Sequence, residues 1–420
     1  MEPQYRDFEL HKLYKHSGLF VIVGLILMYW SQSMYFVAGN MARMGSLAIG
    51  LGLILGASYL RAPQRIFKHT LFVVLTGGYF LALAMLSQFQ QHAIRYDRTQ
   101  QIFCVVCLVM FWAGYILARE KRQNFVSANQ WSLVGVGCIA IVCLLAFLRF
   151  VKNISFEGSE RGFGETTLNP VGVAYANTCL ALVFVVIGVL NKSLIRKAVH
   201  LLAACCAFFV VLSSASRGAI IWGACALVFF LLLNRHRKYL SGKNILVALL
   251  SGLLLVPIIA VLYTSNYAIA ERIDILFERF TEMFQSLFGG AQARNDLSLS
   301  ARQIMWQNAI STFDQWILFG ERGYDWYPHN QWLEILIRFG ILGIPLLVMS
   351  LFLFIRLGWD VLTRKIHPDV EFSLIATLFV YSYLQSMTSL SLQVNRALWL
   401  GFGYLIGYFL EQRARRSRRI

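Results

Sequence analysis

Charged residues are scarce in this chain, and their scarcity excludes a water-soluble globular protein. Only 14% of the 420 residues are Asp, Glu, Lys or Arg, whereas 58% are hydrophobic, and the mean hydropathy is +0.59. This composition is typical of a polytopic membrane protein. Apolar stretches long enough to cross roughly 30 Å of hydrocarbon predict twelve spans, near residues 17–37, 44–60, 70–88, 101–118, 131–150, 171–190, 198–214, 218–233, 245–263, 330–355, 372–388 and 392–410.

The sequence also lacks the signals that would divide or shorten the chain. The first apolar stretch is not followed by a small-residue cleavage site, so we expect it to be a retained span rather than a removed signal peptide. There is no linker, low-complexity run or internal repeat that would separate a second domain. We therefore predict an all-α fold in which residues 1–420 form a single integral-membrane domain.

Acidic residues are fewer than basic ones, with 21 Asp and Glu against 38 Lys and Arg and a net charge of +17. Most basic residues fall in segments on one side of the twelve-span topology, as the positive-inside rule expects for cytoplasmic segments. The excess charge is thus topogenic and needs no nucleic-acid partner. We expect both termini to be cytoplasmic. The basic segments hold Arg61, Arg65 and Lys68; Arg119, Lys121 and Arg122; Lys192, Arg196 and Lys197; Arg235, Arg237 and Lys238; and Arg413, Arg415, Arg416, Arg418 and Arg419.

Neither cysteine nor histidine spacing predicts a metal site. All eight cysteines fall inside apolar stretches, where Cys104-Val-Val-Cys107 indicates core packing, with a redox or metal pair as the alternative. No histidine and carboxylate spacing typical of a metal site is present either. We expect no metal and no cofactor.

The long polar segment 264–329, between the ninth and tenth spans, is the only sizeable soluble part of the predicted topology. Apolar residues from Ile273 to Leu287 recur there at helical spacing beside charged ones, which predicts an amphipathic helix on the membrane surface. Ser300, with Gln303 three residues later, predicts the cap of a second helix over about 301–315. With the termini inside, this loop lies on the outer side of the membrane.

A histidine stands where this loop becomes an apolar helix, in Pro328-His329-Asn330. The three residues together are a helix-start signal, and a helix amino terminus disfavours added positive charge, so the imidazole of His329 is expected to stay neutral. A neutral imidazole can accept a proton, which makes His329 our candidate for the chemistry. The alternative is that His329 only caps a transmembrane helix at the water interface.

Two arginines lie where a planar cation could bind a phosphate near the membrane boundary. Arg217 follows Ser216 in a very short turn between two spans, and Arg302 lies in the first turn of the helix predicted after Ser300. Planar guanidinium groups in a region of lowered dielectric can hold a diphosphate without a metal. The alternatives are headgroup contact for Arg217 and a solvated ion pair for Arg302. Arg161, in a loop over about 150–170, is either a further phosphate contact or an ordinary loop charge.

Four sequence runs follow one another in this region: SASRGA, SARQIMWQNA, FGERGY and PHNQWLEILIRFGILG. Their order on a twelve-span chain resembles the O-antigen ligase and polymerase superfamily of bacterial envelope glycan enzymes. The signatures of that superfamily are a Ser-Arg-Gly turn, an Arg shortly before a Trp in a large periplasmic loop, and His-Asn followed by a Leu-rich helix ending in Gly-x-x-Gly. The match covers about 210–345 well, and the amino-terminal half only by span count and hydropathy.

The resemblance implies a GT-C-like glycosyltransferase of the bacterial inner membrane, with a periplasmic active site. It would transfer an O-antigen glycan from undecaprenyl diphosphate to lipid A-core, without a metal and with inversion at the anomeric centre. Carried over to this sequence, Arg217 and Arg302 would hold the diphosphate, and His329 would orient or deprotonate the acceptor hydroxyl. Asn330, Ser216 and Arg161 would have supporting roles.

Two alternatives remain open at this point. A polymerase, which joins repeat units to each other, carries the same motifs as a ligase; the amphipathic helices of the polar loop favour a ligase, whose acceptor is a second bulky lipid. A lipid-linked glycan transporter also fits twelve spans. Against a transporter, the chain shows no related halves, and its unusual charges gather on one face.

Overall fold

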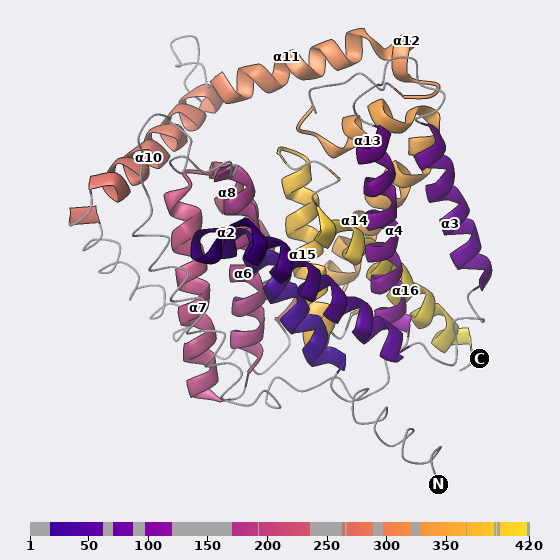
Figure 1. The fold of residues 1–420 in the computed structure, drawn as a ribbon, viewed down its shortest axis with the longest axis horizontal. Helices are drawn as coiled ribbons and strands as arrows, with labels where there is room; N and C mark the ends of the chain where they lie inside the picture. Colours follow the sequence, from indigo (N-terminus) through magenta and orange to yellow (C-terminus); the bar gives the residue numbers. More distant parts are fainter. Residues whose placement is uncertain are drawn as a thin grey trace. The chain divides into compact units, whose positions relative to one another are not determined.

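The computed structural model of the chain describes residues 17–61, 70–86, 97–119, 170–191, 193–235, 263–264, 267–288, 297–320, 328–366, 368–389, 392 and 395–417. Every regular element within those ranges is a helix, which confirms the predicted all-α class (Figure 1). The predicted span 131–150 and nearly all of 245–263 lie outside the described residues, as does the loop over 150–169 with Arg161.

Four helical segments in the described part of the chain are long and apolar enough to cross a membrane. They are Val171–Leu190, Leu194–Ser213, Arg217–Asn234 and Gln331–Leu362, and they coincide with the predicted sixth, seventh, eighth and tenth spans. Shorter apolar helices cover Phe20–Tyr29, Met44–Ser58, Val74–Met85 and Cys104–Arg119. The protein is therefore a multi-pass membrane protein, and the count of twelve spans stays a prediction.

The helices group into two compact units, and neither unit is a continuous segment. The first comprises Met1–Leu60, Arg122–Ala291 and His367–Tyr381, and the second comprises Arg61–Lys121, Gln292–Ile366 and Ser382–Ile420. The predicted single domain over 1–420 is not tested by this grouping.

The first unit begins with α2, Ser17–Arg61, which is not one straight rod. A Cβ added at Gly24 would lie 2.7 Å from the carbonyl oxygen of Gly50, and the Ser46 hydroxyl donates to the Leu27 carbonyl at 2.9 Å. In a straight helix, residues 24 and 50 would be about 39 Å apart. The two apolar halves thus fold back on each other, which fits the two spans predicted there.

Three further helices of the first unit pack side by side: α6 (Pro170–Leu190), α7 (Leu194–Ser213) and α8 (Arg217–Asn234). The predicted tight turn at 214–216 joins α7 to α8. Helix α10, Tyr267–Phe288, lies across the ends of α7 and α8 at this turn (Figure 1). It confirms the predicted amphipathic helix, because Ile273 and Leu276 are buried whereas Glu271 and Asp274 are exposed.

The second unit contains α3 (Thr70–Met85), α4 (Asp97–Arg119), α11 (Leu297–Ser311), α12 (Phe313–Trp316), α13 (Gln331–Phe339), α14 (Ile344–Leu362) and α16 (Arg396–Ser417). The chain crosses from the first unit into the second within α15, Val370–Ser386.

The predicted span over 330–355 is interrupted, because a 3₁₀ turn at Gly340–Gly343 separates α13 from α14. Gly340 has a φ of 54°, and a Cβ there would lie 2.5 Å from the carbonyl oxygen of Leu318. Only glycine fits this left-handed conformation and this close approach without strain. The break therefore depends on glycine at position 340 and on the approach of Leu318, whereas hydropathy alone predicts one uninterrupted span.

Helices α4 and α16 make the closest helix contact in the second unit. A Cβ added at Gly403 would lie 1.8 Å from the Phe111 carbonyl oxygen, and one at Gly114 would lie 2.0 Å from that of Leu400. Small residues at such a crossing let two backbones approach, which is how helices associate where hydrocarbon surrounds them and no hydrophobic force acts. Glycine at these positions therefore fixes the spacing of the two helices.

We expect Gly403→Ala to lower the stability of the protein, because the added methyl group meets backbone that cannot move aside without separating α4 from α16. Overpacking of this kind costs about 1–3 kcal/mol. Gly358→Ala in α14 is the matched control, since a Cβ there has nothing within 4 Å. Thermal unfolding in detergent is the measurement, and equal melting temperatures for the two variants would contradict this packing.

Candidate active site

His329 is held in an unusual backbone conformation at the start of α13. Its φ is 51°, in the left-handed region that non-glycine residues rarely adopt. A residue held there costs about 1–3 kcal/mol and persists only where its surroundings fix it. The neighbouring Pro328 is buried, and His329 itself is half-buried. Strained positions of this kind cluster at functional sites. His329 shares this conformation with Ala215 and Arg364 among the described non-glycine residues.

The two neighbours of His329 are each fixed by hydrogen bonds. The side-chain oxygen of Asn330 accepts from the backbone N–H groups of Trp332 at 3.0 Å and Leu333 at 3.2 Å. Asn330 is therefore the N-cap of α13, as its residue type favours. This confirms the predicted helix start, but it assigns the cap to Asn330, so the alternative in which His329 serves as the cap is wrong. On the other side, the indole N–H of Trp306 donates to the Pro328 carbonyl at 2.6 Å.

The imidazole of His329 is neutral around physiological pH. Burial lowers the pKa of His329 to about 4, and the positive charge of Arg302 lowers it further in the same direction. We predicted a neutral histidine from the dipole of the following helix. The outcome is confirmed, but its main cause is loss of solvent, with a neighbouring guanidinium second. A neutral imidazole beside a fixed cation can accept a proton from a substrate hydroxyl.

Arg302 lies on α11, which begins at Leu297, three residues before the predicted cap. Ser300 is therefore inside the helix, and the capping box predicted from Ser300 and Gln303 is wrong. Propensity explains the difference, because the two leucines at 297 and 299 extend the helix toward its amino terminus. Arg302 is half-buried and close enough to act on the pKa of His329. Of the predicted site residues, the structure brings these two and Asn330 together in one unit.

Arg217, in the first unit, is tied to the surface helix α10. Its guanidinium donates to the backbone carbonyl of Arg279, and the guanidinium of Arg279 in turn donates to the Ala215 carbonyl at 3.1 Å. Ala215 has a φ of 51° and reverses the chain between α7 and α8. Ser216 is the buried residue at the N-cap position of α8, but its side chain makes no capping hydrogen bond. Two cationic side chains are thus held at the amino terminus of α8, where the helix dipole also favours an anion.

Two residues of the site were missed in the sequence. Arg279 was counted only among the charges of an amphipathic helix, and no local pattern distinguishes it from the others. Trp306 was seen only as part of a motif, although a signal was available: it follows Arg302 by four residues, and that spacing places both on one face of a helix. The contact each makes joins segments 22 or more residues apart, which periodicity cannot reveal.

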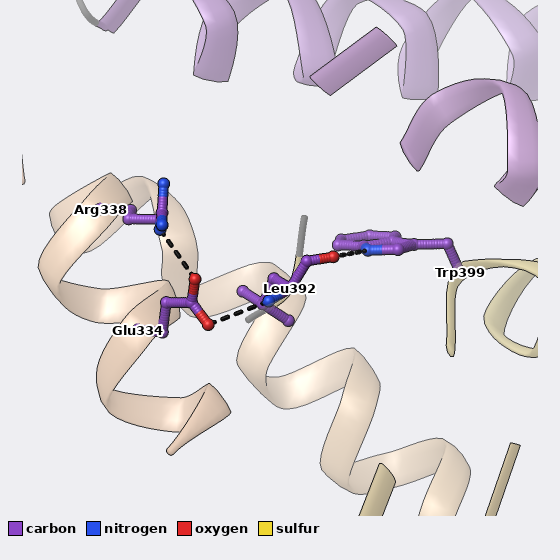
Figure 2. A network of polar contacts seen from close by, with 4 residues as sticks. All are labelled: Glu334, Arg338, Leu392 and Trp399. Carbon is purple, nitrogen blue, oxygen red and sulfur yellow. Dashed lines mark hydrogen bonds and ion pairs between the residues drawn. The ribbon is translucent and has the colours of Figure 1, made fainter. Parts of the chain in front are cut away.

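The buried carboxylate of Glu334 joins α13 to a second segment of the chain (Figure 2). Glu334 accepts from Arg338 Nε at 3.0 Å, four residues further along the same helix, and it also accepts from the backbone N–H of Leu392 at 3.0 Å. The indole of Trp399 donates to the carbonyl of the same leucine at 3.1 Å. Through Leu392, this network joins α13 to the segment that precedes α16.

Some residues near the site in sequence are not placed by the structure. The predicted contact Arg161 lies outside the described residues, as do the loop carboxylates Glu321 and Asp325. Arg217 belongs to a different unit from Arg302 and His329. Within the described ranges, no group of three or more His, Cys, Asp or Glu side chains is arranged to hold a metal ion. Metal independence stays a prediction.

Part of the chain matches a known protein family. Residues 201–348 match the model of a family described as O-Antigen ligase, over about a third of the chain. The matched segment contains Arg217, Arg279, Arg302, Trp306 and His329. No curated protein matches the chain. The family match confirms the resemblance inferred from the four sequence runs.

We expect the low pKa of His329 to appear as a pH-dependent loss of stability. A histidine in the unfolded chain titrates near 6.5, whereas His329 in the folded protein titrates at about 4. As the pH falls from about 7 to about 4, His329 therefore becomes protonated in the unfolded chain but stays neutral in the folded protein. The free energy of unfolding declines over this range. His329→Asn removes this proton but tolerates the left-handed backbone. The melting temperature of wild type relative to the variant should fall across this window, and a constant difference would contradict the assignment.

Proposed function

We propose that this chain, as a member of the O-antigen ligase and polymerase superfamily, transfers a glycan from an undecaprenyl diphosphate carrier to an acceptor hydroxyl. The observation that carries the proposal is the neutral His329 held in a strained turn beside the fixed cation of Arg302. We propose the reaction on the periplasmic face of the bacterial inner membrane, in a GT-C-like fold of twelve spans with cytoplasmic termini. The preferred acceptor is lipid A-core, which makes the enzyme a ligase.

The proposed reaction needs one base and one anion site. His329 accepts the proton of the acceptor hydroxyl while its oxygen attacks the anomeric carbon, and the bond from that carbon to the diphosphate breaks with inversion. Arg302 stabilises the negative charge that develops on the departing diphosphate. Atoms and charge balance without a further reactant, since the proton ends on His329 and the electron pair ends on the diphosphate.

The position of Arg302 also links donor binding to the strength of the base. A base with a pKa of about 4 is weak at neutral pH, and part of that low pKa comes from the charge of Arg302. A bound diphosphate offsets this charge and raises the pKa of His329 toward the pH at which general bases work best. We therefore propose that His329 becomes an effective base only when the donor is present, which limits unproductive proton transfer in the empty enzyme.

In the other unit, we propose that Arg217 and Arg279 are further phosphate contacts. Two positive charges at one helix amino terminus favour the binding of an anion there. A guanidinium has five N–H donors in a planar fork, which matches the oxygens of a phosphate. Ser216 supports this site by its position at the turn, and Arg161 remains a candidate contact from the sequence alone.

Helix α10 favours a ligase over a polymerase. Phe277 is 66% exposed and Phe284 is 54% exposed, and the two are seven residues apart on the same face of the helix. An apolar face of this kind suits the interface of a membrane and a second lipid substrate. The acceptor of a ligase is such a lipid, whereas a polymerase extends a glycan on the same type of carrier as the donor.

The test is glycan transfer by purified protein, supplied with undecaprenyl-diphosphate-linked glycan and lipid A-core in excess EDTA. We expect product in wild type. His329→Asn should lower turnover by roughly 10² to 10⁴, the usual loss when a general base is removed, while membrane insertion and melting temperature at pH 7 stay close to wild type. Mass spectrometry of the lipids and of the free undecaprenyl diphosphate measures both products.

The other outcomes separate the alternatives. Extension of the carrier-linked glycan in place of transfer to lipid A-core identifies a polymerase. Movement of labelled carrier lipid across vesicles without transfer identifies a transporter. Loss of activity in EDTA that magnesium restores would reject the arginine-based mechanism and implicate carboxylates such as Asp325.

We expect lysine to replace neither proposed arginine contact. At Arg302 or Arg217, lysine keeps the charge but loses the planar fork that pairs two phosphate oxygens, so turnover should stay far below wild type. Arg364→Lys, on a residue outside the proposed site, is the control. Binding of undecaprenyl diphosphate to each variant is the measurement, because it reports the anion site separately from the base. Full binding by both lysine variants would show that only net charge matters.

A further inference from the structure

Trp306 forms a hydrogen bond to the backbone next to His329, and packing of the indole ring would not by itself require this bond. Trp306 lies in α11, and its indole N–H reaches the carbonyl of Pro328, 22 residues further along the chain, at 2.6 Å. The indole is half-buried rather than part of the closed core, which is formed by Ala309, Trp316 and Ile337. The contact is thus a specific bond to one peptide group.

That peptide group sets the conformation of His329. The carbonyl of Pro328 and the N–H of His329 belong to the same planar peptide unit. Rotation of this unit changes the φ of His329, which stands at 51°. A bond that fixes the carbonyl therefore fixes the left-handed turn. On the other side of His329, Asn330 is held by its capping hydrogen bonds. Hydrogen bonds therefore fix the residues on both sides of the turn.

The same helix carries Arg302 one turn before Trp306. Residues four apart lie on one face of a helix, so the guanidinium and the indole both point toward the turn at His329. The charge of Arg302 acts on the imidazole. Because the indole hydrogen bond joins α11 to Pro328, it also fixes the position of Arg302, the proposed phosphate contact, relative to His329, the proposed base.

We propose that Trp306 is a positioning residue for glycan transfer: its bond to Pro328 holds the turn that directs the imidazole of His329 and aligns it with Arg302. The inference rests on the proposed function. Trp306 contacts no reacting atom and acts only through His329. It follows that the indole N–H matters for turnover, while the shape of the ring matters for packing.

The test replaces Trp306 by 3-benzothienylalanine, an isostere that has sulfur in place of the N–H, with Trp306→Phe as a second variant. Small misplacements of a catalytic group cost up to about 10² in rate, so we expect turnover to fall roughly 10- to 100-fold with donor affinity nearly unchanged. Trp316 is the matched control: it is also in the second unit, and its indole donates to the Ala309 carbonyl at 2.9 Å within the core. The same replacement at Trp316 should lower the melting temperature but not the turnover of folded protein.

A double-mutant cycle with His329→Asn distinguishes positioning from a general structural role. If Trp306 acts through His329, its replacement should have no further effect once the imidazole is gone, because residues that act as a unit are not additive. Multiplicative losses, or full turnover by the benzothienylalanine protein, would overturn the inference. Absence of transfer in wild type would instead reject the proposed function.

A second readout needs no substrate. Relaxation of the turn would return His329 toward solvent and away from Arg302, so its pKa should rise toward the ordinary value. The His329-dependent loss of stability between pH 7 and pH 4 should then shrink in the Trp306 variants and persist in the Trp316 control. An unchanged pH dependence in the Trp306 variants would also overturn the inference.

Discussion

Hydrocarbon offers no hydrogen-bond partners, and this constraint governs where the chain can hold polar chemistry. Backbone groups inside the membrane must bond to each other, so the described spans are helices, and irregular backbone is confined to their ends or to places covered by protein. The candidate residues follow this rule. Arg217 lies at the first residue of α8, His329 directly before α13, and Arg302 on a helix outside the apolar segments. The helix termini supply the polar groups that the interior of the membrane excludes.

Several buried polar side chains along the spans are hydrogen-bonded within the protein, as Ser373 is to Asn234 and Ser386 is to Gln331. Glu334 shows the pattern, because both of its carboxylate oxygens have partners, one on its own helix and one on the segment before α16. A carboxylate with a single partner at this depth would be unfavourable. The network joins the middle of α13 to the segment before α16. The hydrogen bonds of Trp306 and of the Asn330 cap hold the amino-terminal end of the same helix. The candidate base is therefore supported on a helix that cannot easily shift along its axis.

The fold class was predictable because the signal is local: composition gave a multi-pass membrane protein, and apolar length gave the described spans. The helix break at Gly340 was not predicted, since it depends on the backbone approach of Leu318, far away in sequence. At the site, His329 and the Asn330 helix start were predictable from residue type and position. Arg279 was not, because its role arises from a bond to Ala215 across 64 residues. The capping prediction at Ser300 was wrong because leucines before it continue the helix. Residue type and local spacing can be interpreted from a single sequence, whereas contacts between segments that are distant in the sequence cannot.

The segment 297–320 is fastened to α13 at both ends of that helix. Trp306 bonds to Pro328 just before it, the backbone of Leu318 and Gly320 meets Gly340 just after it, and Trp316 packs against Ile337 between them. Two separate attachments resist both sliding and tilting of α13 against the segment 297–320. Arg302 and the residues next to His329 therefore lie on segments that would move together. A substrate that displaced α11 would displace the candidate base with it.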